Sequence, residues 1–163
     1  MPPDAAGRRT IEFLIDRDRL ERIDGTTAVD AAALVLGRAK RRLLTAAGGI
    51  DVGDHEGGFA ASYDAYRMAA EALLVRQGLR ATGGEGSHAS VEDAISGQFG
   101  LRIASFVKPT FERLRRTRHA AQYFDPSSPE INEDDARWAL ATAQAAVDGT
   151  ADILTVDPPE LFR

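Results

Sequence analysis

Hydrophobic residues recur along most of this chain at the three- and four-residue intervals that place them on one side of an α-helix. No run alternates apolar and polar residues around a hairpin turn, and no segment repeats at a fixed period. The pattern therefore predicts an all-α fold, a mostly antiparallel bundle of about five helices. The helical segments are residues 10–23, with a break expected near Asp16, then 27–46, 59–76, 88–99 and 109–123, and a last helix that follows Asn132.

Residues that favour helix ends divide the chain between these segments. We predict N-caps at Thr10, Thr27, Ser87 and Asn132, and a helix end at Gly78. The glycine-rich segments are expected to be loops, and they match neither a Walker A loop nor an EF-hand: residues 48–58 and 81–86.

These boundaries define three regions of the chain. We expect a flexible N-terminal tail at residues 1–9, a single helical domain at residues 10–156 and a C-terminal tail at residues 157–163. Within the domain, residues 59–76 are apolar around most of a helical circumference. Such a helix is expected at the centre of a bundle.

The segment Phe111–Phe124, FERLRRTRHAAQYF, is the most basic run of the chain. On a helix, Phe111, Leu114 and Arg118 share one stripe, so Arg118 occupies a position where an apolar residue is expected. Removing a guanidinium group from water without a partner is costly. We therefore expect Arg118 to line a cleft or to have a buried partner, and the 59–76 helix offers two carboxylates: Asp64 and Glu71.

A second basic cluster lies on the predicted exposed side of the 27–46 helix. It has two interpretations, a solvated face or a binding surface, and its members are Arg38, Lys40, Arg41 and Arg42.

Composition narrows the possible chemistry. The formal net charge of −5 argues against nucleic-acid binding by bulk electrostatics, so any RNA contact must be local to the basic run. The chain has no Cys and only three His, which excludes disulfides and Cys-based zinc sites, and we expect neither a metal nor a cofactor. No apolar run approaches the ~20 residues of a membrane span, and no signal peptide is evident. We expect a cytoplasmic protein.

Three segments carry a family resemblance. They are ASYDAYRMAAEALLVRQGLR (Ala61–Arg80), EGSHASVEDAISGQFG (Glu85–Gly100) and FERLRRTRHAAQYFDPSSPEINEDDARWALATAQAAV (Phe111–Val147). In this order they resemble a HEPN domain, a helical module of many prokaryotic toxin–antitoxin and nucleotidyltransferase-associated systems. The resemblance covers roughly residues 28–154. The segment 10–23 lies outside the common core, as expected for a small, stand-alone, actinobacterial-like HEPN protein.

Many HEPN domains are metal-independent ribonucleases in which an Arg is followed, a few residues later, by a catalytic His. The resemblance assigns the motif Arg to Arg118 and the polar residue after it to His119, which leaves Tyr123 at the place of the catalytic His. A phenol titrates near ~10 and is a poor proton shuttle at neutral pH. On this register the chain looks like a HEPN member that has lost its catalytic His. A second register pairs Arg113 with His119.

Together these features favour a non-catalytic HEPN-like module that binds RNA, a nucleotide or a protein in a toxin–antitoxin-like system. Its binding surface would include Arg113, Arg115 and Tyr123, beside Arg118 and His119. The resemblance implies two protein partners, a second copy in a homodimer and a nucleotidyltransferase. The alternative is a metal-independent endoribonuclease in which Arg118 or Arg113 acts with His119, because an imidazole transfers protons near neutral pH. A third interpretation gives Arg118 only a structural role.

Overall fold

The computed structural model describes residues 4–84, 86–123 and 126–163. Within these ranges the chain forms six α-helices, two short 3₁₀ turns and one small antiparallel sheet, so the predicted all-α fold is confirmed. The helices are α1 (Ala5–Asp16), α2 (Ala28–Asp51), α3 (His55–Arg76), α4 (Ser87–Phe99), α5 (Lys108–Gln122) and α6 (Glu133–Val156). The strands are β1 (Leu20–Arg22) and β2 (Leu79–Ala81), and the 3₁₀ turns are Gly25–Thr27 and Ala104–Phe106.

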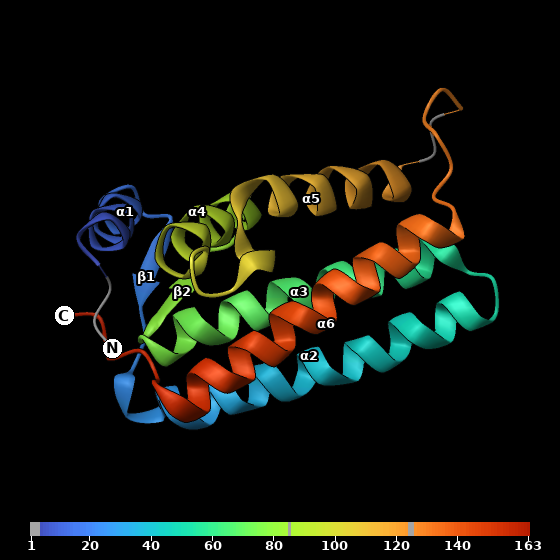
Figure 1. Cartoon of the computed structure of the whole chain (residues 1–163). Coiled ribbons are helices and arrows are strands. Elements are labelled where there is room, and N and C mark those ends of the chain that lie inside the picture. The colour runs from blue at the N-terminus through green and yellow to red at the C-terminus, as the bar shows by residue number, and fades with distance from the viewer. Residues whose placement is uncertain (1–3, 85, 124–125) are drawn as a thin grey trace.

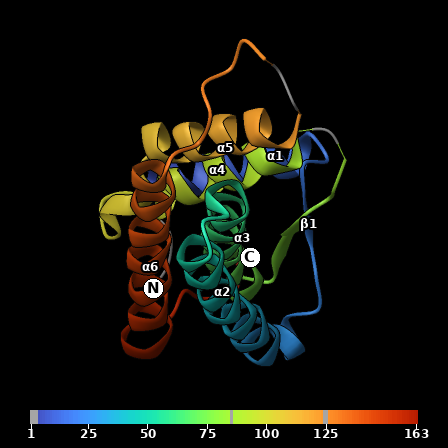
Figure 2. The ribbon, with the colours of Figure 1, turned by 90° about the vertical axis from the view of Figure 1, so that its right-hand side faces the viewer.

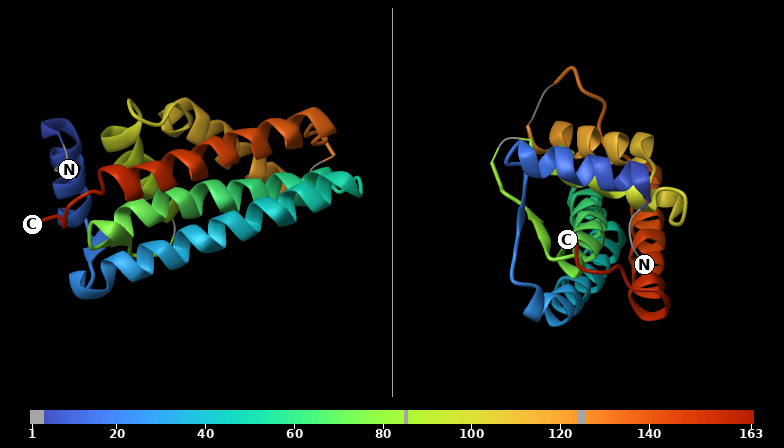
Figure 3. Two further views of the ribbon diagram at one scale, coloured as in Figure 1. Left: turned by 60° about the horizontal axis from the view of Figure 1, so that its bottom comes forward. Right: turned by 90° about the vertical axis from the view of Figure 1, so that its left-hand side faces the viewer.

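Helix α3 lies at the centre of this arrangement. Helices α2, α3 and α6 run side by side as a long layer, and α4 and α5 lie across one face of it (Figures 1 and 2). Helix α1 and the β1–β2 ribbon lie at one end of the layer (Figure 3). Because α3 contacts α2, α4, α5 and α6, 12 of its 22 residues are buried, among them Phe59, Tyr66 and Leu73. The central position predicted for this helix is confirmed.

The segment 48–58 is mostly helical, contrary to the prediction of a loop. Helices α2 and α3 extend into it and leave only residues 52–54 between them. A Cβ atom on Gly49 would lie 3.1 Å from the backbone nitrogen of Gly58. Gly49 and Gly58, which suggest a loop in the sequence, therefore allow α2 and α3 to pack closely at this point.

The first helix begins earlier than predicted. Asp4, rather than Thr10, caps α1, and its Oδ1 accepts a hydrogen bond from the Gly7 N–H at 2.7 Å. A Cβ atom on Gly7 would lie 2.7 Å from Cγ of Gln98, so α1 packs closely against α4 at this point. Residues 5–9 of the expected tail are therefore helical, while residues 1–3 lie outside the described ranges. Helix α1 ends at Asp16, near the predicted break, but the prediction of a helix for residues 17–23 is wrong, because this stretch contains strand β1.

The two strands are absent from the sequence prediction. They pair antiparallel, with Leu20 opposite Ala81 and Arg22 opposite Leu79. Strands of three residues are too short to display an alternating pattern, and the two partners are far apart in the sequence. The pairing depends on the relative positions of α1 and α3, which precede β1 and β2 in the chain, and the sequence of either strand alone does not reveal it.

The expected C-terminal tail packs against the domain. Phe162 is 6% exposed, and its N–H donates to the backbone oxygen of Gln77 at 2.9 Å. The packed unit therefore extends beyond the predicted limits of residues 10–156 at both ends.

Of the four predicted N-caps, Thr27 and Asn132 are confirmed. Asn132 caps α6 through a capping box: its Oδ1 accepts from the Asp135 N–H at 2.9 Å, and Asp135 Oδ2 accepts from the Asn132 N–H at 3.1 Å. Thr27 is the N-cap of α2 but makes no capping hydrogen bond with its side chain. Gly86, rather than Ser87, is the N-cap of α4. The helix end at Gly78 is confirmed by a positive φ of 74°.

Replacing Asn132 with Ala should lower the free energy of unfolding by about 1 kcal/mol, because the Asp135 N–H loses its acceptor. Thr27→Ala is the matched control and should cost less, since no capping hydrogen bond is lost. Urea denaturation of the two variants and the wild type measures the difference. Equal losses in both variants would contradict the assignment of the capping box.

Candidate nucleic-acid interface

Aromatic packing holds the start of α5 against α3. The ring of Phe111 lies edge-on to Tyr66, with 4.6 Å between the ring centroids, and stacks on Phe106 at 5.6 Å. Tyr66 also donates its hydroxyl hydrogen to the backbone oxygen of Ser105 at 2.6 Å. With Leu114 fully buried one turn further on, these contacts fix the rotation of α5 about its axis. They determine which of its basic side chains face α3 and α4.

Arg118 connects α5 to α3 through contacts with polar and aromatic groups. Its Nη2 lies 3.7 Å from Oδ1 of Asp64, its Nη1 donates to Gln122 at 3.3 Å, and its guanidinium carbon lies 5.3 Å from the Tyr63 ring centroid. Of the two carboxylates suggested by the sequence, Asp64 is therefore the partner, and Glu71 pairs instead with Arg67. The side chains of Arg118 and Asp64 are 26% and 28% exposed, so this ion pair remains accessible to water.

Tyr63 and His88 form a second link, between α3 and α4. The Tyr63 hydroxyl lies 2.8 Å from Nδ1 of His88. Burial raises the pKa of Tyr63 to about 12, so the phenol keeps its proton, and we assign it as the donor to Nδ1. Burial also lowers the pKa of His88, and the nearby charges of Arg67 and Arg118 lower it further. The lowered pKa favours the neutral imidazole of His88, and with the Tyr63 hydroxyl as the donor its N–H lies on Nε2.

Arg115 is anchored by a buried carboxylate of α4. Its Nε donates to Oε2 of Glu92 at 3.3 Å, and the side chain of Glu92 is only 3% exposed. Burial raises the pKa of Glu92, whereas the charge of Arg115 and the hydrogen bond lower it. The pair therefore holds Arg115 in a fixed position at the junction of α4 and α5.

A pocket of about 500 Å³ opens between the start of α4 and the basic side of α5. We call it the α4–α5 pocket, and the residues that line it are Gly84, Gly86, Ser87, His88, Ala89, Arg115, Arg116 and His119. Arg115 and His119 are four residues apart and so project from the same side of the helix. The pocket thus gathers two guanidinium groups and two imidazoles on one concave surface.

The other predicted site residues lie outside this lining. Arg118 lines a separate cavity of about 270 Å³, together with Gln122. Arg113 faces α6, where its guanidinium carbon lies 3.7 Å from the Trp138 ring centroid. Tyr123 is 62% exposed, and its ring centroid lies 4.9 Å from that of His119. The structure therefore groups His119 with Arg115, and with neither Arg118 nor Arg113.

Three residues of the site were not singled out by the sequence. From the sequence, Arg116 is expected on a solvated face of the 109–123 helix, His88 at the start of the 88–99 helix, and Glu92 at a polar position within that helix. Their common role depends on which side of α5 meets α4, and periodicity within one helix does not reveal this. The nearest signal in the sequence is that His88 follows the glycine-rich segment 81–86 with only Ser87 between them.

The described part of the chain contains no group of three or more His, Asp or Glu side chains arranged to hold a metal ion. No helix within the same ranges is long and apolar enough to cross a membrane. Comparison with known proteins gives no match to any family model, curated protein or solved structure.

The difference in exposure between Glu92 and Asp64 predicts how replacing their partners on α5 changes stability. Arg115→Ala should lower the free energy of unfolding by about 1–3 kcal/mol, because it leaves Glu92 buried without its partner. Arg118→Ala should cost less than about 1 kcal/mol, because Asp64 keeps contact with water. Urea denaturation at pH 7 compares the two variants. A larger loss for Arg118→Ala would contradict this order.

The lowered pKa of His88 predicts a dependence of stability on pH. The unfolded chain binds a proton at this residue at a higher pH than the folded chain does. Acidification through the ordinary histidine range near ~6.5 should therefore lower the free energy of unfolding. His88→Asn keeps a polar group near Tyr63 but does not titrate, so its stability should fall less.

Urea titrations of both proteins between about pH 7.5 and 5.5 measure this difference. The raised pKa values of Glu71 and Glu92 act in the opposite direction, since the folded chain protonates them more readily. These carboxylates are present in both proteins, so the comparison isolates His88. Parallel curves would show that His88 does not have the neutral role assigned to it.

Proposed function

We propose that this protein is a HEPN-like helical module that binds RNA in the α4–α5 pocket without cleaving it. The observation that carries the proposal is the gathering of Arg115, Arg116 and His119 around one pocket of about 500 Å³. Guanidinium groups bind phosphate oxygens through paired N–H donors, and imidazoles add further donors. An RNA phosphate is the anion that suits this set of groups.

The wall of the pocket formed by the start of α4 offers uncharged N–H donors. Helix α4 has no side-chain N-cap, and its first residues, Ser87, His88 and Ala89, line the pocket. The backbone N–H groups of a first helical turn favour an anion. The neutral His88 contributes its Nε2–H from the same wall. A phosphate in the pocket would thus lie between charged donors on α5 and neutral donors on α4.

Tyr123 supports an unpaired RNA strand as the ligand. Its exposed ring lies next to His119, at the end of α5. An exposed aromatic ring beside a phosphate site offers a stacking surface for a base, which a single strand presents and a duplex does not. The HEPN resemblance extends the proposal to a cytoplasmic homodimer with a nucleotidyltransferase partner in a toxin–antitoxin-like system.

RNA binding can be tested with fluorescence anisotropy of a labelled single-stranded RNA. The wild type should bind, and Arg116→Ala should bind more weakly and reduce the salt slope by about 1, because one phosphate contact is lost. Arg41→Ala, on the exposed basic cluster of α2, is the matched control and should bind like the wild type. Loss of binding in Arg41→Ala alone would place the RNA on α2. Absence of binding by the wild type would exclude the proposal.

One observation favours a second candidate, a metal-independent endoribonuclease. Two imidazoles, His88 and His119, line the same pocket as Arg115. RNA cleavage without metal needs groups that accept and donate a proton and a cation that stabilises the negatively charged transition state. This grouping differs from both Arg–His pairings suggested by the sequence.

Incubation of cellular RNA with the wild type in EDTA separates binding from cleavage. The binding proposal predicts intact RNA. Cleavage that is abolished in both His119→Ala and His88→Asn, but retained in Arg41→Ala, would instead establish the endoribonuclease. Cleavage that survives in every variant would indicate a contaminating nuclease.

A further inference from the structure

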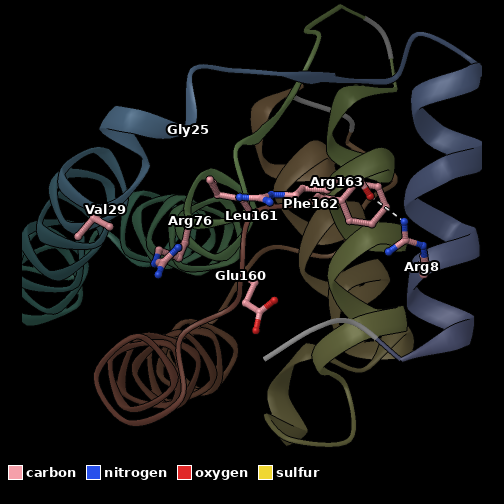
Figure 4. A pocket seen from close by; sticks show the side chains of 8 residues that line it. All are labelled: Arg8, Gly25, Val29, Arg76, Glu160, Leu161, Phe162 and Arg163. Atoms are coloured by element: carbon pink, nitrogen blue, oxygen red, sulfur yellow. Dashed lines mark hydrogen bonds between the residues drawn. The ribbon is translucent and has the colours of Figure 1, made fainter.

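A hollow of about 640 Å³ lies at the end of the molecule away from the C-terminal end of α5. It shares no lining residue with the α4–α5 pocket. We call it the C-terminal hollow. It lies between the start of α2, the end of α3, helix α1 and the C-terminal segment (Figure 4). Its volume is within the range of about 300–1,000 Å³ typical of small-molecule sites. The residues that matter for its chemistry are Arg8, Val29, Arg76, Glu160, Leu161 and Arg163.

The C-terminal wall of the hollow is held in place by specific contacts. The ring of Phe162 lies between two guanidinium groups, with 5.1 Å to the Arg8 carbon and 5.3 Å to that of Arg22. Arg22 donates to the backbone oxygen of Phe162, and Arg8 Nη2 donates to that of Arg163 at 2.7 Å. The backbone of this wall is therefore ordered before any ligand arrives, which reduces the entropic cost of binding.

Arginines from three distant parts of the sequence meet at this hollow. Arg8 belongs to α1, Arg76 to the last turn of α3 and Arg163 to the C-terminal segment. Figure 4 shows Arg8 and Arg76 at opposite ends, with the C-terminal segment between them. Arg8 is already engaged by Glu12 at 3.0 Å. Among the described residues, neither Arg76 nor Arg163 has a carboxylate within ion-pair distance.

A structural role accounts for only part of this arrangement. An arginine in the last turn of a helix interacts favourably with the partial negative charge of the helix end, and this explains the position of Arg76. It does not explain why Arg163 lines the same hollow. Among the side chains of the described lining residues, three arginines stand against one carboxylate, that of Glu160. Val29 and Leu161 provide an apolar surface beside it.

We propose that the C-terminal hollow binds a small phosphate-bearing ligand whose pyrophosphate-type group is held by Arg76 and Arg163. Arginine suits such a group because its planar fork of N–H donors matches two phosphate oxygens at once. The less polar part of the ligand packs on Val29 and Leu161. The site is separate from the α4–α5 pocket, so its occupation neither requires nor prevents RNA binding there.

Isothermal titration calorimetry with inorganic pyrophosphate, at constant ionic strength, tests the proposal on the full chain. The wild type should bind with one site per chain. Arg76→Ala and Arg163→Ala should each weaken binding by about tenfold to a hundredfold, as expected for the loss of a charged hydrogen-bonding group. Two controls should bind like the wild type: Arg41→Ala on α2 and Arg116→Ala in the α4–α5 pocket.

The controls separate this proposal from the RNA site. Pyrophosphate binding that is lost in Arg116→Ala but kept in Arg76→Ala would place the anion in the α4–α5 pocket and overturn the proposal. Absence of saturable binding by the wild type would overturn it as well, while RNA binding by the same sample would leave the proposed function intact. If Arg76→Ala is destabilised in urea, Arg163→Ala decides, because its side chain belongs to an exposed residue.

Discussion

The burial of most of the circumference of α3 is the constraint on which the rest of the structure depends. Fully buried alanines, among them Ala69 and Ala72, allow its neighbours to approach closely, while Tyr66 fills the space beneath α5. A helix enclosed in this way can accommodate polar side chains only where it meets other helices that supply partners. Tyr63 and Asp64 occupy such a junction, and their partners come from α4 and α5. The polar network of the candidate site is thus a consequence of the core.

The sequence predicts the parts of the fold that local periodicity and capping determine. The central helix and the cap at Asn132 follow from the residues of single segments. The prediction fails where one segment depends on another. Gly49 and Gly58 suggest a loop because their sequence does not reveal the close packing of α2 against α3. Likewise, the sequence of β1 does not show that it pairs with β2.

The same division applies to the candidate site. The basic run, the unusual place of Arg118 and the candidacy of Asp64 can all be derived from helical spacing. The grouping of His119 with His88 cannot, because it depends on the rotation of α5 against α4. Each residue advances about 100° around a helix, so neighbours such as Arg115 and Arg116 can be assigned to a site only after the buried side is fixed.

The distribution of charge explains how an acidic chain can hold anions at defined places. Several basic side chains are paired with carboxylates, as in Arg80–Glu21, Lys108–Asp93 and Arg137–Glu133, and contribute little attraction at a distance. The arginines of the α4–α5 pocket are paired too, Arg115 with Glu92 and Arg116 with Glu112. With a net charge of −5, the protein as a whole repels polyanions. Under the two proposals, affinity for an anion at the α4–α5 pocket and at the C-terminal hollow would come from directed N–H donors within each concave site. Under this constraint the arrangement of donors within a site, more than the number of basic residues, would determine which anion binds.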